Sequence, residues 1–158
     1  MSVAFRRESD DAHLEPTFEL PIPAGPNYVT TRGLAQIATK LAELTAHLDS
    51  LTDESKMKAS KRELRYWNTR QSTAQLLERP DGTRVAFGCT VDYALNGKQN
   101  SITLVGDDEA DASLGLVSFT APLARAMLDA EVGDVLDFAG KAEALDIRDI
   151  RVRPELFA

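Results

Sequence analysis

The chain has 158 residues, of which 43% are hydrophobic and 27% charged, a composition typical of one soluble globular domain or two small units. No apolar run approaches the roughly 20 residues that a membrane-spanning helix requires. A single cysteine and two histidines exclude a disulfide framework and a zinc site built on these residues. We expect a cytoplasmic protein without a membrane partner, because residues 1–11 are polar and contain no signal-peptide core.

The charges are segregated along the chain. The net charge of −7 predicts that the whole chain repels free nucleic acid. Residues 56–79, however, contain seven basic and two acidic side chains, a net of +5, whereas residues 81–158 contain seven basic and fourteen acidic ones, a net of −7. Asymmetry of this kind indicates a binding partner.

Residues 1–26 are predicted to form an extended N-terminal arm, because four prolines forbid a continuous helix there. Phe18, Leu20 and Ile22 alternate with other residues, which is the pattern of a short edge strand or of a docked extended segment. A partly ordered arm is the interpretation that we favour.

Residues 27–79 predict an antiparallel helical hairpin. Thr30 or Thr31 can cap the first helix, whose seam has heptad spacing: Leu34, Ile37, Leu41, Leu44, Leu48 and Leu51. The second helix is expected to begin between Asp53 and Met57, and its seam is Met57, Ser60, Leu64, Trp67, Gln71 and Ala74. Two narrow stripes joined by a short polar stretch favour a coiled coil, with arms of roughly 30 Å at 1.5 Å per residue.

Residues 80–158 predict a compact antiparallel sheet with one short helix. After a turn at Pro80-Asp81-Gly82 the periodicity changes from heptad to alternation, and the predicted strands are residues 84–93, 101–105, 116–119, 135–138 and 144–152. Asn96-Gly97 is a tight-hairpin signal between the first two strands, and Pro122 precedes a short helix over residues 123–128. Cys89 lies mid-strand and is interpreted as a buried, inert thiol. The fold class is therefore α+β.

Four segments carry a resemblance to one known family. They are residues 105–111 (VGDDEAD), 118–128 (SFTAPLARAML), 131–135 (EVGDV) and 28–34 (YVTTRGL). The first three are similar, in order and spacing, to the VGxxEAD, SxxSP[LI]ARAL and ExGDxV motifs of the Gre-type bacterial transcription elongation factors. The fourth resembles the entry into that family's first coiled-coil helix. Together the resemblance covers residues 27–152.

The resemblance implies a fold, a partner and a reaction. Gre-type factors combine an antiparallel coiled coil with an FKBP-like C-terminal domain, so residues 80–158 are expected to be the polymerase-binding domain. The implied partner is the bacterial RNA polymerase elongation complex, whose secondary channel the hairpin enters, close to the nascent RNA. The implied polymerase contacts are Ser118, Thr120, Pro122 and Arg125. No stand-alone activity is expected, and no cofactor bound alone, only a Mg²⁺ shared with the polymerase.

The hairpin tip reads DSLTDES from Asp49, where the family has GDxxENA. Asp49 matches the family's aspartate, and Thr52 stands at the position of its glutamate. A one-residue adjustment in the loop would let Asp53 replace that carboxylate, with Glu54 directly after it. We therefore predict Asp49, Asp53 and Glu54 as catalytic acids, and Asp49 and Asp53 as the ligands of the shared Mg²⁺. The alternative is that Asp53 or Ser50 caps the second helix, with Glu54 in its first turn. Thr52 supplies no carboxylate at this position, and the arms are several turns shorter than those of the cleavage-competent members of the family. Both features favour a second function, a binding-only regulator that occupies the channel without stimulating RNA cleavage.

The second helix carries a run of basic residues: Lys56, Lys58, Lys61, Arg62, Arg65 and Arg70. We predict that this run contacts RNA or the acidic channel wall; a solvated helix face is the alternative. The acidic residues 107–111 lack the spacing of a Ca²⁺ loop and are interpreted as a structural turn or as a surface facing basic polymerase residues. A prolyl isomerase is a third function, disfavoured because most of the available aromatic residues (Phe87, Tyr93, Phe119 and Phe138) are predicted to lie in the core.

Overall fold

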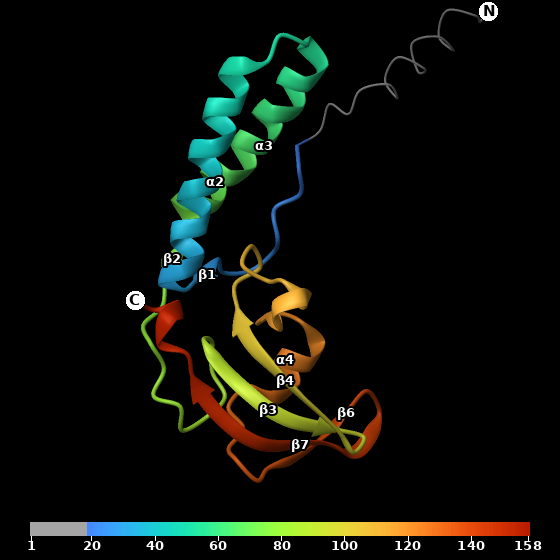
Figure 1. Ribbon diagram of the computed structural model, residues 1–158. Coiled ribbons are helices and arrows are strands. Elements are labelled where there is room, and N and C mark those ends of the chain that lie inside the picture. The colour runs from blue at the N-terminus through green and yellow to red at the C-terminus, as the bar shows by residue number, and fades with distance from the viewer. Residues whose placement is uncertain (1–18) are drawn as a thin grey trace, which may run out of the picture.

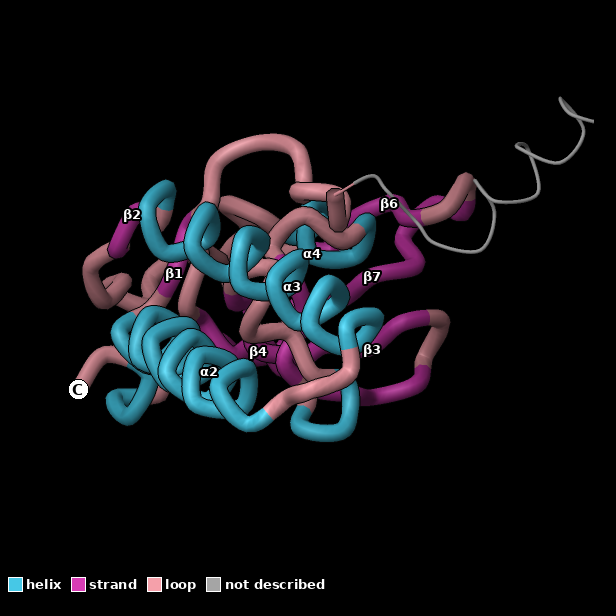
Figure 2. The backbone as a smooth tube through the Cα atoms, turned by 90° about the horizontal axis from the view of Figure 1, so that it is seen from above, coloured by secondary structure: helices cyan, strands magenta, loops and turns pink. Residues whose placement is uncertain are grey.

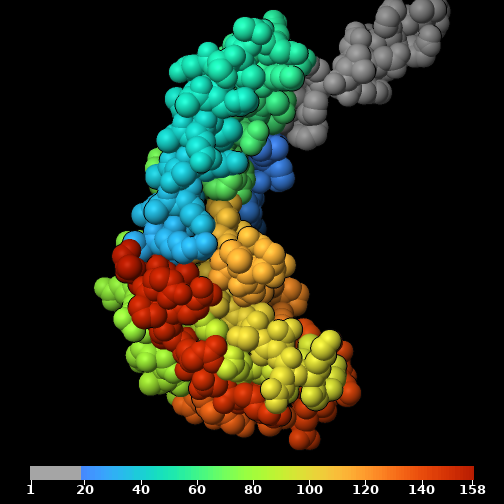
Figure 3. Space-filling model, viewed as in Figure 1, coloured from blue at the N-terminus to red at the C-terminus, as the bar shows by residue number. Residues whose placement is uncertain are grey.

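The computed structural model describes residues 19–158, and it consists of a helical hairpin standing on a sheet domain (Figure 1). The predicted arm lies largely outside the described residues, including Phe18. Figure 3 shows the hairpin projecting from the sheet domain as a narrow extension, with the C-terminal residues packed at its base. The predicted α+β class, with a hairpin followed by a sheet, is confirmed. Within the described residues, no helix is long and apolar enough to cross a membrane.

The hairpin consists of α2 (Thr31–Ser50) and α3 (Glu54–Thr73), which lie side by side in Figure 2. Thr30 caps α2 as predicted, because its hydroxyl accepts a hydrogen bond from the backbone N–H of Gly33 at 3.0 Å. The apolar seam of α2 faces α3, with Ile37 and Leu44 buried.

The seam predicted for α3 is wrong at one position near the base. Gln71 is exposed, and Arg70 takes the inward position with an exposed fraction of 2%. A helix with 3.6 residues per turn drifts away from a strict seven-residue repeat, and here α3 packs against the sheet domain as well as against α2. Trp67, the largest residue of this seam, is half-buried and packs edge to face against Tyr66, with the ring centroids 5.0 Å apart.

The base of the hairpin is joined by a small parallel sheet that the sequence did not predict. β1 (Tyr28–Val29) precedes α2 and β2 (Gln75–Leu76) follows α3. The backbone N–H of Gln75 donates to the carbonyl of Asn27 at 2.8 Å, and that of Leu77 donates to Val29 at 3.1 Å. The two ends of the hairpin are therefore tied to each other. The boundary that we place at residue 80 stays a prediction.

The main sheet has five strands in the order β5-β4-β3-β7-β6. Its strands are β3 (Cys89–Leu95), β4 (Lys98–Val105), β5 (Leu116–Ser118), β6 (Val135–Phe138) and β7 (Lys141–Val152). β5 pairs with β4 in parallel, so the sheet is mixed and not wholly antiparallel as predicted. The predicted tight turn at Asn96-Gly97 is confirmed, since both residues have positive φ.

The strand predicted over residues 84–93 is wrong in its first half. Residues 84–88 form a loop in which the N–H of Val85 donates to the carbonyl of Ala130 and Gly88 has a φ of 93°. An apolar run therefore enters the core here without joining the sheet. The short helix α4 (Pro122–Met127) begins with Pro122 in its first turn, as predicted.

The core lies between the sheet and α4, and it includes Val91, Leu104, Met127 and Ile147. Cys89 is fully buried there, and this burial raises the pKa of its thiol, in agreement with an inert role. Phe87 and Tyr93 are 9% and 5% exposed, so the prediction that these rings are core residues is confirmed. The other two rings, Phe119 and Phe138, are only partly buried.

Candidate functional site: the hairpin tip, its basic face and the junction

The acidic tip lies at the end of the hairpin that is farthest from the sheet domain (Figure 1). Asp49 is exposed in the last turn of α2, and Glu54 is exposed in the first turn of α3. Asp53 caps α3, because its Oδ1 accepts hydrogen bonds from the N–H groups of Ser55 and Lys56 at 2.8 and 3.3 Å. The capping interpretation is thus confirmed for Asp53. Among the described residues, no group of three or more acidic, histidine or cysteine side chains could hold a metal ion.

The basic run of α3 divides into a face and two residues that lie elsewhere. Lys58, Lys61, Arg62 and Arg65 occupy positions i, i+3, i+4 and i+7 and so share one side of the helix. We call these four residues the basic face. Lys56 is exposed in the first turn on another side, and Arg70 is buried at the base. Arg65 forms an ion pair with Glu19, with Nη2 at 2.9 Å from Oε2, and the hydrogen bond from Arg65 lowers the pKa of Glu19.

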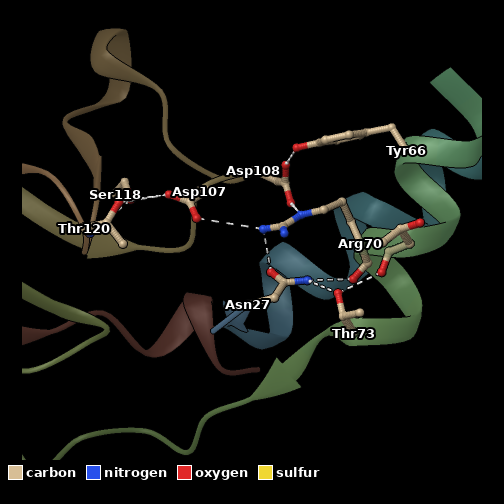
Figure 4. Close-up of polar contacts among 9 residues, drawn as sticks. Asn27, Tyr66, Arg70, Thr73, Asp107, Asp108, Ser118 and Thr120 are labelled. Atoms are coloured by element: carbon tan, nitrogen blue, oxygen red, sulfur yellow. Dashed lines mark hydrogen bonds and ion pairs between the residues drawn. The ribbon is translucent and has the colours of Figure 1, made fainter. Parts of the chain in front are cut away.

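Arg70 is the centre of a buried polar network at the junction of the hairpin and the sheet domain (Figure 4). Its Nε donates to Oδ2 of Asp108 at 2.5 Å, and its Nη2 donates to Oδ1 of Asn27 at 2.8 Å. The side-chain amide of Asn27 in turn donates to the carbonyl of Arg70 at 2.8 Å and to Oγ1 of Thr73 at 3.1 Å. A buried guanidinium must be paired in this way, because an unpaired buried charge is strongly destabilising.

Tyr66 completes this network from one turn earlier in α3. Its hydroxyl donates to Oδ1 of Asp108 at 2.6 Å, so both carboxylate oxygens of Asp108 are bonded to α3. Burial, followed by the hydrogen bond to Asp108, raises the pKa of Tyr66 well above its ordinary value. The phenol therefore stays protonated and remains a donor.

A second contact holds the first turn of α2. Glu109 is 6% exposed; its Oε1 accepts from the hydroxyl of Thr30 at 2.7 Å and its Oε2 accepts from Nη1 of Arg32 at 2.8 Å. The approach is close: a Cβ at Gly33 would lie 2.7 Å from Oε1 of Glu109, and a Cβ at Gly106 would lie 2.3 Å from the carbonyl oxygen of Tyr28. Glycine is required at position 106, where the obstacle is backbone, whereas a side chain at position 33 would have to displace the carboxylate of Glu109.

Three residues of the acidic run serve a structural turn, as one interpretation predicted, whereas Asp111 is exposed. Asp107, Asp108 and Glu109 face the chain's own hairpin. The sequence pattern did not reveal that Arg70 pairs with Asp108, or that Glu109 pairs with Arg32. The one available signal was the lack of an apolar residue near the base of the α3 seam, where the polar Gln71 follows Arg70.

The residues expected to contact the polymerase lie beside this junction. The hydroxyls of Ser118 and Thr120 donate to Oδ1 of Asp107 at 2.6 and 3.1 Å, and Oδ2 of Asp107 is 3.9 Å from Nη2 of Arg70. Pro122 and Arg125 follow on α4, and both are exposed. Ser118 at the end of β5 and Thr120 in the turn that follows thus lie next to the buried network around Arg70, and Pro122 and Arg125 lie on α4.

Comparison with known proteins decides the family. The family model described as "Transcription elongation factor, GreA/GreB, C-term" matches residues 79–154. Transcription elongation factor GreA of Agrobacterium fabrum (strain C58) is 31% identical over 113 residues, which cover 65% of this chain and 71% of that relative. The chain belongs to the GreA/GreB family of transcription elongation factors.

Other relatives of this Gre-family chain match over shorter segments. GreA of Thioalkalivibrio sulfidiphilus (strain HL-EbGR7) is 46% identical over 57 residues, covering 35% of this chain and 36% of that protein. The chain thus matches little more than a third of the length of that relative. A solved structure of GreA/GreB from Nitrosomonas europaea aligns with a TM-score of 0.39 and 17% identity, covering 81% of this chain and 99% of that one. Similarity at that level adds nothing to the assignment.

Proposed function

We propose that this Gre-family protein binds the bacterial RNA polymerase elongation complex and holds its hairpin in the secondary channel. The observation that carries the proposal is the buried junction around Arg70 and Asp108. Because the hairpin is fixed to the sheet domain at its base, a grip on the sheet domain sets the direction of the tip about 30 Å away, the length of a 20-residue helix. A protein with this partner acts in the cytoplasm.

We assign the polymerase grip to the surface of β5 and α4. Ser118 and Thr120 are engaged with Asp107, whereas Pro122 and Arg125 are exposed beside them. A partner bound to this surface would be next to the socket of the hairpin. Binding of the polymerase and the orientation of the hairpin would then depend on neighbouring residues, because Ser118 and Thr120 contact Asp107 and Asp107 lies beside Arg70.

We assign the chemistry to Asp49 and Asp53 at the tip. Mg²⁺ takes carboxylate and water ligands in an octahedral arrangement, so two tip carboxylates suit an ion that polymerase carboxylates and water complete. A Mg²⁺ held by Asp49 and Asp53 together with polymerase groups would supply an activated water for hydrolysis of a phosphodiester bond. The role of the chain is to present the two acids to the polymerase, and Glu54 adds negative charge beside them.

A second candidate function is supported by a specific contact. Oδ1 of Asp53 is engaged by two backbone N–H groups at the start of α3, which leaves Oδ2 as the oxygen available to a metal. Thr52, at the position of the family's glutamate, supplies no carboxylate. These two features favour a regulator that occupies the channel without stimulating cleavage.

We further propose that the basic face contacts nascent RNA. Lys58, Lys61, Arg62 and Arg65 present cations along one side of the arm that would enter the channel. Cations so placed would neutralise phosphates, and the contact would weaken as salt increases.

The test of the main function uses stalled, backtracked elongation complexes with labelled RNA and Mg²⁺. We expect the wild-type protein to accelerate RNA cleavage and Asp49→Asn to abolish the acceleration without loss of polymerase binding. Asp129→Asn, which removes one exposed carboxylate far from the tip, is the matched control. If wild-type protein binds the complex but never accelerates cleavage at any Mg²⁺ concentration, the binding-only regulator stands.

A further inference from the structure

Residues 19–22 lie against α3 on the side of the basic face. Glu19 forms a two-point ion pair with Arg65, through Nε to Oε1 and through Nη2 to Oε2. The segment and the helix enclose a hollow of about 140 Å³, which is lined by Glu19, Leu20, Ile22, Arg62, Arg65, Tyr66 and Thr69. Figure 1 shows this segment, in dark blue, descending beside α3 toward β1. The chain therefore covers part of its own basic face.

The covering contact is a weak one. The side chains of Glu19 and Arg65 are 54% and 57% exposed, and exposed ion pairs contribute little to stability. Leu20 and Ile22 remain 37% and 46% exposed, so the segment is only partly packed. A ligand that offers Arg65 a competing anion can displace such a segment.

We propose that residues 19–22 form a strap that competes with the phosphates of single-stranded RNA for Arg65. The inference rests on the RNA contact proposed above and adds a regulatory element to it. When the strap is bound, Arg65 is ion-paired with Glu19 and the basic face has a smaller net positive charge. When RNA displaces the strap, Arg65 pairs with a phosphate and the carboxylate of Glu19 returns to solvent.

The competing anion is placed for this role. Glu19 is the acidic residue of the segment, and it lies 46 residues from Arg65 in the chain, so the pairing arises from the fold and not from local sequence. RNA offers a series of phosphates, whereas the strap offers one carboxylate. Several phosphates can engage neighbouring cations at once, and RNA therefore prevails at low salt.

The test compares Glu19→Gln with Glu43→Gln in the full chain. Glu43 is exposed on α2, so both variants change the net charge by +1 and only the first releases the strap. Binding of a short, fluorescein-labelled, single-stranded oligouridine is measured at increasing salt. We expect Glu19→Gln to bind about two- to fivefold more tightly than Glu43→Gln, the factor by which a weak surface ion pair can compete. Because Arg65 pairs with a phosphate once RNA has displaced the strap, the number of phosphate contacts, and so the slope of the salt dependence, should be similar in the two variants.

The outcomes separate the strap from the RNA contact. If wild-type protein binds oligouridine, Lys61→Gln weakens binding, and Glu19→Gln equals Glu43→Gln, the strap is overturned while the RNA contact stands. If none of the proteins binds oligouridine at low salt, the RNA contact is overturned and the strap with it. If Glu19→Gln increases affinity for polymerase but not for oligouridine, the strap covers a protein-binding face, which contradicts the competition with RNA.

Discussion

Replacement of Arg70 by alanine should detach the hairpin from the sheet domain without unfolding the sheet. The guanidinium is 2% exposed and donates to Asp108 and Asn27, and the side chain of Asp108 is itself 9% exposed. The substitution leaves Asp108 with Tyr66 as its donor and the amide oxygen of Asn27 without one. Removing one partner of a buried ion pair costs about 3–5 kcal/mol, and we expect a loss in that range.

The assay is urea unfolding followed by two probes. The chain's single tryptophan, Trp67, lies on α3, so its fluorescence reports on the hairpin, while circular dichroism reports on the whole chain. In Arg70→Ala the fluorescence transition should move to lower urea than the remaining dichroism change. Lys61→Ala, on the exposed side of the same helix, should change the free energy of unfolding by no more than about 0.5 kcal/mol.

Arg70→Lys separates charge from geometry. Lysine keeps the positive charge but cannot donate to Asp108 and Asn27 in the same forked arrangement, so its cost should lie between those of wild type and alanine. If Arg70→Ala costs no more than Lys61→Ala, or if both probes of Arg70→Ala shift together, the junction is not what fixes the hairpin and our reasoning is refuted.

Three further predictions concern pH, the tip and the grip. The pKa of Tyr66 is higher in the folded chain than the value of 10.0 in the unfolded chain. The protonated phenol therefore contributes its full stabilisation below pH 10, and this contribution is lost as the pH rises through the folded pKa. Urea unfolding at about pH 8 and about pH 11 should therefore show a loss that Tyr66→Phe reduces, and an undiminished loss in that variant would argue against it. Asp53→Asn should keep helix capping, and so thermal stability, while abolishing stimulated RNA cleavage; cleavage equal to wild type would leave Asp53 as a cap alone. Arg125→Glu should weaken polymerase binding at unchanged stability in a pull-down with purified polymerase, and unchanged binding would remove Arg125 from the grip.

Local sequence signals predicted the hairpin well. The Thr30 cap, the leucine seam of α2 and the start of α3 at Glu54 depend on residues within a few positions of each other. The location of the acidic tip follows directly from these boundaries. The loop over residues 84–88 could not be distinguished from a strand, because the apolar stretch Val85-Ala86-Phe87 has the same composition whether it joins the sheet or only enters the core.

The junction could not be predicted in the same way. Arg70 and Asp108 are 38 residues apart, and nothing local distinguishes a buried arginine from one on a solvated face. The sequence therefore places Arg70 in the basic run, although its guanidinium belongs to the buried network with Asp108 and Asn27. The parallel pairing of β5 was missed for a related reason, since a three-residue strand carries no signal for its direction.

The most direct test of polymerase binding with an inserted hairpin is to locate the tip within the elongation complex. Cys89 is the chain's single cysteine and is fully buried, so Thr52→Cys creates a unique reactive thiol in the tip loop. An iron chelate attached there generates hydroxyl radicals that cut nearby RNA and protein, and Ala38→Cys on α2 is the control, farther from the tip. We predict cuts in the RNA near its 3′ end and beside the polymerase active centre from position 52, and cuts farther out from position 38. A bound protein whose tip label cuts neither would contradict insertion of the hairpin into the channel.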